Sequence, residues 1–71
     1  MNKNLIGEYA GIVWRMLESK GSLSFEELQN ETDLDLPEIF AAIGWLARED
    51  KISFNKENGI TSVRLYQETY Y

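Results

Sequence analysis

Carboxylates are the side chains of this sequence whose spacing comes nearest to supporting chemistry, and they are densest near the middle of the chain. Glu31, Asp33 and Asp35 alternate along the sequence, as the first ligands of a calcium-binding loop do. Such a loop needs a glycine at its sixth position and a glutamate at its twelfth, but Leu36 and Ala42 stand there. We therefore expect no metal site in this segment.

Residue types that most enzymes use for nucleophilic catalysis or zinc binding are missing. The 71 residues include no cysteine and no histidine, so Ser–His and Cys–His pairs and the usual zinc ligands are excluded. Gly7 and Gly11 lie within a helical pattern, with no strand before them and no Lys-Ser or Lys-Thr after them, unlike a phosphate-binding loop. The sequence therefore predicts no enzyme activity, no cofactor and no small-molecule substrate.

The acidic residues have a simpler use as helix caps. Ser24 and Glu27 have the spacing of a capping box, in which each side chain binds the other residue's backbone amide. Asp35 is followed by Pro37 and Glu38, which are typical of the first turn of a helix. These two signals predict the starts of two helices.

Apolar residues at three- and four-residue spacing predict three helices. The first covers residues 4–20, the second covers about 25–31, and the third follows Asp35. A short extended stretch near 22–24 separates the first two. The residues expected to face the core are Leu5, Tyr9, Ile12, Val13 and Met16 in the first helix, Phe25 and Leu28 in the second, and Ile39, Ala42, Ile43 and Leu46 in the third.

The C-terminal third of the chain has the pattern of a β-hairpin. Residues 51–55 and 61–66 alternate between apolar and polar types. Asn58-Gly59, which lies between them, is a strong signal for a tight hairpin turn. Ile52 and Phe54 are expected on one face of the first strand, and Val63 and Leu65 are expected to point inward from the second.

The stretch FEELQNETDLDLPEIFAAIGWLAREDKISF resembles the winged helix-turn-helix superfamily. The apolar residues at the positions that this pattern requires are Leu28, Leu34, Ile39, Ala42, Ile43, Leu46 and Ile52. The resemblance covers residues 5–67, and the length and layout are similar to those of small stand-alone bacterial winged-helix proteins of unknown function. It implies an α+β fold, with three helices and a C-terminal β-hairpin wing, in a single domain over residues 1–71.

The third helix does not resemble a typical DNA-recognition helix. The residues that match the outward positions of such a helix are Leu36, Pro37, Glu38, Phe40, Ala41, Gly44 and Trp45. Contacts to bases need donors and acceptors, and contacts to phosphates need cations. Residues 24–50 hold eight acidic residues against one basic residue, Arg48. Nucleic acid binding is therefore disfavoured, unless cations elsewhere gather on one side of the domain.

The outer side of the third helix favours contact with a protein instead. Pro37, Ala41, Gly44 and Arg48 fall opposite the core on a helical wheel, and Phe40 and Trp45 flank them. Small residues allow another backbone to approach, and large aromatic side chains anchor interfaces. In the first helix Gly7, Ala10, Gly11 and Trp14 are expected opposite the face that carries Tyr9. The alternative is that Trp45 packs on the wing and Trp14 on the last strand or on residues 68–71.

These patterns predict a non-catalytic protein-interaction module that self-associates, as a homodimer, or binds another protein, through an apolar third helix flanked by acids. The predicted partner-binding residues are Leu36, Pro37, Phe40, Ala41, Gly44 and Trp45, with Gly7, Gly11 and Trp14 in the first helix. The alternative is a DNA-binding transcriptional regulator whose footprint lies outside the third helix. The sequence contains no long apolar run and no signal peptide pattern, so we expect a cytoplasmic protein without membrane contact.

Overall fold

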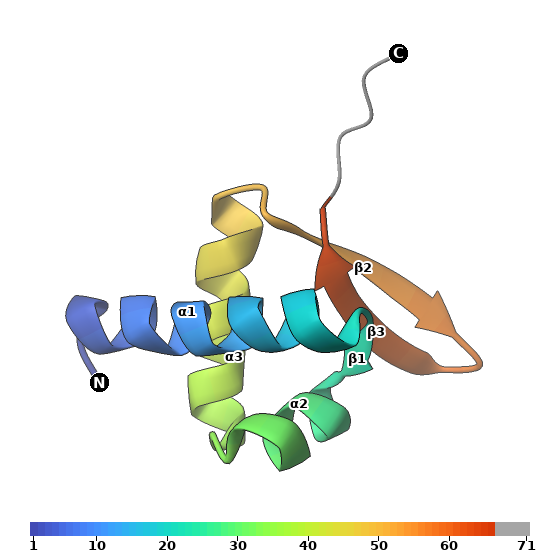
Figure 1. The fold of residues 1–71 in the computed structure, drawn as a ribbon, viewed down its shortest axis with the longest axis horizontal. Coiled ribbons are helices and arrows are strands. Elements are labelled where there is room, and N and C mark those ends of the chain that lie inside the picture. The colour runs from blue at the N-terminus through green and yellow to red at the C-terminus, as the bar shows by residue number, and fades with distance from the viewer. Residues whose placement is uncertain (67–71) are drawn as a thin grey trace.

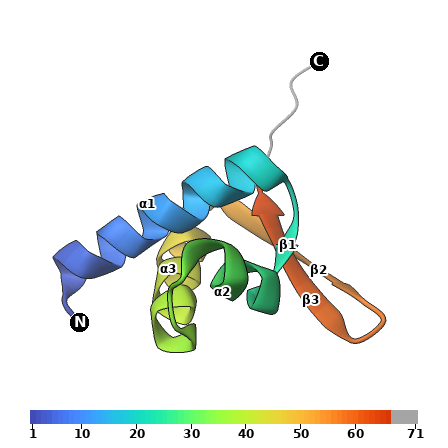
Figure 2. The same ribbon diagram turned by 60° about the horizontal axis from the view of Figure 1, so that its bottom comes forward.

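The computed structural model describes residues 1–66 and packs three helices against a three-stranded sheet (Figure 1). In chain order the elements are α1 (Lys3–Lys20), β1 (Leu23–Ser24), α2 (Phe25–Thr32), α3 (Leu36–Arg48), β2 (Ile52–Glu57) and β3 (Ile60–Leu65). Figure 2 shows α2 and α3 together beneath α1, with the β2–β3 hairpin extending away from the helices. This is the winged helix arrangement that the sequence predicts.

Local hydrogen bonds fix the starts of α2 and α3. At α2, the Ser24 hydroxyl accepts a bond from the Glu27 amide at 3.1 Å, and the Glu27 carboxylate accepts one from the Ser24 amide at 2.9 Å. At α3, Asp35 and Glu38 form the same reciprocal pair, with both distances 2.9 Å. The predicted capping box at Ser24 and the predicted cap at Asp35 are confirmed, and Glu38 completes a second box that was not predicted. Between the two helices Asp33 takes a left-handed conformation, with φ of 60°, which turns the chain sharply.

The sheet has the strand order β1-β3-β2, and both pairings are antiparallel. Leu23 and Phe54 both pair with Val63, so the three share one face of the sheet with Ile52. Leu23, Val63 and Ile52 are buried, but Phe54 is 51% exposed. Ile52 and Phe54 thus share one face, as predicted, but burial stops short of Phe54. Phe54 lies two residues beyond Ile52 on β2, and the β2–β3 hairpin extends past the helices (Figure 1).

The core lies between the three helices and the inner face of the sheet. It consists of Ala10, Val13, Leu17, Leu23, Leu28, Ile39, Ala42, Ile43, Leu46, Ile52 and Val63. The four core residues predicted for α3 are all buried.

The expected orientation of α1 is only partly right. Val13 is buried as predicted, but the buried line continues through Ala10 and Leu17, whereas Tyr9 and Met16 pack at the margin of the core and are partly buried. Ala10 belongs to the face that was expected to be free. The reason is that α3 crosses α1 on this side (Figure 1), and a small residue on a helix lets its neighbour approach closely.

Tyr9 connects α1 to the first turn of α3. Its hydroxyl lies next to the Glu38 carboxylate, which raises the pKa of Tyr9. The backbone amide of Asp35, and then Tyr9, lower the pKa of Glu38. The Ser24 amide similarly lowers the pKa of Glu27. The ionised form of each glutamate is therefore the form that the fold stabilises.

The pKa of each glutamate lies below the ordinary 4.5 in the folded state. Each ionised glutamate therefore stabilises the fold above that pH, and this contribution to the free energy of unfolding is lost as the pH falls through the folded-state pKa. A Glu27→Gln/Glu38→Gln variant keeps hydrogen-bond acceptors that do not titrate. Between about pH 7 and about pH 3 its thermal midpoint, followed by circular dichroism, should fall less than that of the unmodified protein. A Glu18→Gln/Glu57→Gln variant removes the same charge away from the caps. Equal acid sensitivity in the two variants would contradict the prediction.

Candidate interaction surface

The outward side of α3 is apolar and open. Leu36, Phe40 and Trp45 are 40%, 53% and 41% exposed, and Pro37 is exposed beside them. Gly44 is exposed, and a methyl group added to it would meet no other atom within 4 Å in the described part of the chain. Ala41 is partly buried. All six predicted α3 residues therefore reach the surface, where large side chains flank small ones.

Phe40 extends this apolar surface towards α2. Its ring packs edge-to-face against Phe25, with centroids 5.4 Å apart and planes at 85°, an arrangement that aromatic pairs prefer. Phe25 is the first residue of α2, and the capping box that precedes it holds it in place. Sequence spacing assigned Phe25 to the core alone. It is only partly buried, and its contact with Phe40 depends on how α2 meets α3, which spacing does not show.

A groove runs between α1 and the C-terminal half of α3. We call it the α1–α3 groove, and its lining residues are Gly7, Ala10, Gly11, Trp14, Arg15, Glu18, Trp45, Leu46 and Lys51. Its volume is about 550 Å³. The structure thus brings the predicted residues of α1 together with Trp45, instead of placing them on a separate outer face.

The two tryptophans occupy different depths in this arrangement. Trp14 is half-buried and packs against the core, whereas Trp45 lies at the exposed margin of α3. Trp14 thus belongs to the margin of the core as well as to the groove. The alternative contact of Trp14 with residues 68–71 lies outside the described residues.

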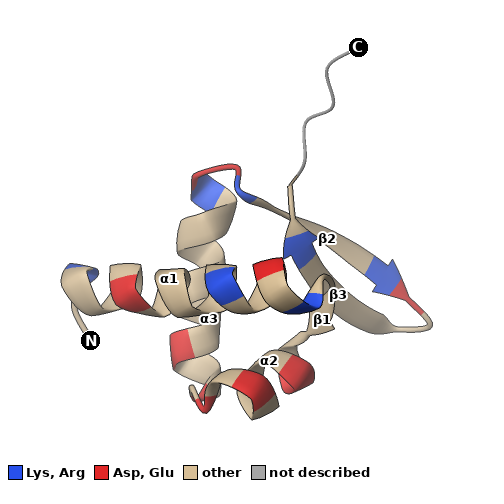
Figure 3. Cartoon of the chain, viewed as in Figure 1, with Lys and Arg blue, Asp and Glu red and all other residues tan. Residues whose placement is uncertain are grey.

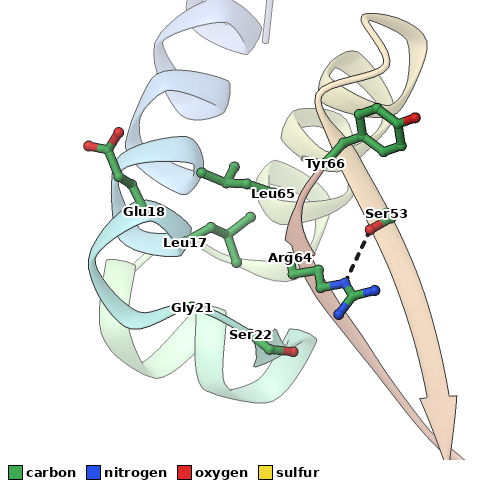
Figure 4. A pocket seen from close by; sticks show the side chains of 8 residues that line it. All are labelled: Leu17, Glu18, Gly21, Ser22, Ser53, Arg64, Leu65 and Tyr66. Atoms are coloured by element: carbon green, nitrogen blue, oxygen red, sulfur yellow. Dashed lines mark hydrogen bonds between the residues drawn. The ribbon is translucent and has the colours of Figure 1, made fainter. Parts of the chain in front are cut away.

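A second and larger pocket, of about 690 Å³, lies between the end of α1 and the sheet (Figure 4). It forms because β1 is two residues long and pairs only with Ser62 and Val63. Beyond Val63, β3 stays paired with β2, but its edge towards Gly21 and Ser22 has no partner strand. Arg64 projects over β2, and its Nε donates to the Ser53 hydroxyl at 3.4 Å (Figure 4). Sequence reasoning did not find this pocket, because it depends on where β1 ends.

One part of the domain carries charges of a single sign (Figure 3). Acidic residues alone lie on α2 and at the start of α3, whereas α1, the end of α3 and the β2–β3 hairpin carry both acidic and basic residues. Along α3 itself, Asp35 and Glu38 stand at the start and Arg48 at the end. The start of a recognition helix usually enters the DNA groove, and carboxylates there repel phosphates.

The described residues form neither a metal site nor a membrane-spanning helix. Across residues 1–66, no three histidine, cysteine or acidic side chains lie close enough together to hold a metal ion. None of the helices in this range is long and apolar enough to cross a membrane.

Comparison with known proteins identifies the family. Residues 1–65 match the family described as winged helix-turn-helix domain (DUF2582). The chain belongs to this family. It is also similar to the solution NMR structure of protein BT2368 from Bacteroides thetaiotaomicron, with a TM-score of 0.83 and 28% identity over 100% of this chain and 95% of that chain. None of the curated proteins matches the sequence.

These matches confirm the predicted resemblance to winged helix-turn-helix proteins. The similar solved structure is also a bacterial protein of similar length, as predicted. A winged helix-turn-helix domain is typically non-catalytic. The fold alone does not decide between protein contact and DNA contact, because one fold carries many functions. The choice depends on the surface of α3.

Glycine at positions 7 and 44 is not required by the conformation of the helices. A Cβ atom at either position meets nothing within 4 Å in the described part of the chain, and glycine inside a helix costs roughly 1 kcal/mol relative to alanine. Gly7→Ala and Gly44→Ala should each raise the free energy of unfolding by roughly 0.5–1 kcal/mol in urea titrations at low protein concentration. Gly59→Ala is the matched control and should lower it, because φ at Gly59 is +79°. A loss of stability in Gly7→Ala or Gly44→Ala would show that another group already packs against these positions and leaves no room for a methyl group.

Proposed function

We propose that this domain is a non-catalytic protein-interaction module that forms a homodimer through the outer side of α3. The observation that carries the proposal is the exposure of Leu36, Phe40 and Trp45 around a row of small residues on one helix. Large apolar side chains on a free surface are stabilised when a partner covers them. A small domain also gains stability when association adds to a limited core.

The row of small residues has the spacing of a helix-packing seam. Pro37, Ala41, Gly44 and Arg48 follow one another at intervals of four, three and four residues. This interval keeps one line of a helix in contact with a neighbouring helix. The middle of the seam, Ala41 and Gly44, has almost no side chain, so two such helices approach closely.

An antiparallel pair of α3 helices fits this seam. When Ala41 faces Gly44 of the second copy, two-fold symmetry repeats the contact with the roles exchanged. In this register Phe40 lies over Gly44 of the second copy, and Trp45 lies over Ala41 of the second copy. Each large exposed ring is thus matched with a position that has room for it.

The acidic start of α3 and its helix dipole support the same orientation. The start carries Asp35 and Glu38, whereas at the end the charges of Arg48 and Lys51 are balanced by Glu49 and Asp50. An antiparallel pair keeps the two acidic starts apart and pairs the helix dipoles favourably. A parallel pair would bring the two acidic starts together, which disfavours that orientation.

A variant in the centre of the seam tests the homodimer. The expected mass by size exclusion with light scattering is twice 8.3 kDa for the unmodified protein and 8.3 kDa for Gly44→Arg. The long charged side chain should raise the dissociation constant at least about 100-fold, as loss of a central contact does. Asn30→Arg adds the same charge on the exposed side of α2 and should leave the dimer intact. If the unmodified protein is still monomeric at about 0.5 mM, a concentration at which weak dimers are populated, the homodimer proposal is wrong.

DNA binding is the competing function, and it predicts a different set of results. Anisotropy of a labelled mixed-sequence duplex at about 0.15 M salt should show no saturable binding. A phosphate footprint outside α3 would instead give saturable binding that weakens steeply as salt rises. Lys51→Gln and Arg64→Gln would then reduce the affinity for the duplex, whereas Gly44→Arg would not.

A further inference from the structure

We propose that the α1–α3 groove binds a small aromatic carboxylate. This inference goes beyond the homodimer, because the groove lies on the α1 side of α3, whereas Phe40 lies on its α2 side. Trp45 borders both surfaces. The ligand would therefore bind next to the dimer seam without occupying it.

The groove has the shape of a small-ligand site. Gly7 and Gly11 leave its α1 side open, while the buried Ala10 and Leu46 give it an apolar floor. Trp14 on α1 and Trp45 on α3 supply an indole from each helix. The volume of about 550 Å³ falls within the range of roughly 300–1,000 Å³ that is typical of small-molecule pockets. A flat apolar body fits walls of this kind, because aromatic rings stack favourably.

The charges around the groove select an anion. Arg15 and Lys51 line it together with a single acid, Glu18, so the local charge is positive although the whole chain carries −5. A Cβ atom built on Gly11 would lie 3.4 Å from Nη1 of Arg15, so the missing side chain lets the guanidinium lie against α1 beside the groove. A guanidinium binds a carboxylate through paired hydrogen bonds. The aromatic walls and this cation together define the ligand class.

The chain offers a direct readout of occupancy, because both of its tryptophans line the groove. The experiment titrates the ¹⁵N-labelled full chain with 2-naphthoate and follows the two indole N–H signals by NMR. Both signals should shift and saturate at submillimolar to millimolar concentration, as expected for a ligand of this size. The neutral analogue 2-naphthalenemethanol should bind about two- to fivefold more weakly, the scale of one exposed ion pair.

Filling the groove provides the decisive variant. Gly7→Leu places a side chain in the groove from a position where an added Cβ meets nothing within 4 Å in the described chain, so the fold is retained. It should weaken naphthoate binding at least about tenfold, whereas Ser19→Leu, on the exposed end of the same helix, should not. Equal binding by Gly7→Leu and Ser19→Leu, or shifts that never saturate, would overturn the site. Equal binding of the neutral analogue would overturn the role of the carboxylate.

The ligand site and the homodimer fail independently. Gly44→Arg disrupts the seam and should still bind naphthoate, whereas Gly7→Leu fills the groove and should still form dimers. If Gly44→Arg abolishes naphthoate binding, the ligand occupies the dimer interface and the separate groove site is wrong. If naphthoate binds normally to a chain that is monomeric at every concentration, only the homodimer is wrong.

Discussion

The packing of α3 across α1 is the constraint on which the surface of this domain depends. Ala10 on α1 and Ala42 on α3 are both buried, and small residues at a helix crossing bring the two axes close. Because Ile39, Ala42, Ile43 and Leu46 all point inward, the orientation of α3 about its own axis is fixed. The same orientation turns Phe40, Gly44 and Trp45 outward. The exposed apolar side of α3 is thus a direct consequence of how its core side packs.

The acidic residues at the start of α3 stabilise the helix and shape its electrostatics at the same time. Asp35 and Glu38 cap the helix, and Glu38 also lies next to Tyr9 of α1. The capping bonds hold both carboxylates close to the turn that joins α2 to α3, and they lower the pKa of Glu38. The residues that cap α3 therefore also create a negative potential at its start. In winged helices that bind DNA, this part of the helix usually approaches the phosphates.

Local features were predictable from the sequence, and features that depend on distant elements were not. Each helix cap involves residues close in the sequence, so the box of Ser24 with Glu27 and the cap at Asp35 were found directly. Alternation in β2 placed Phe54 on the inner face correctly, but it does not show where the core ends along a strand. The apolar arc of α1 is broad, and only the position of α3 decides that Ala10 is buried while Tyr9 is partly exposed. The α1–α3 groove is missed for the same reason, because it needs both helices in place.

The helical glycines indicate how the two proposed surfaces relate to the fold. Gly59 has a positive φ that its turn requires, so its presence is explained within the chain. Gly7 and Gly44 have helical conformations and open surroundings in the described residues, so each reduces helix stability without a compensating contact inside the subunit. In the arrangement that we propose, the compensation comes from outside. A second α3 approaches over Gly44, and a flat ligand approaches beside Gly7, because neither glycine has a side chain to keep them away.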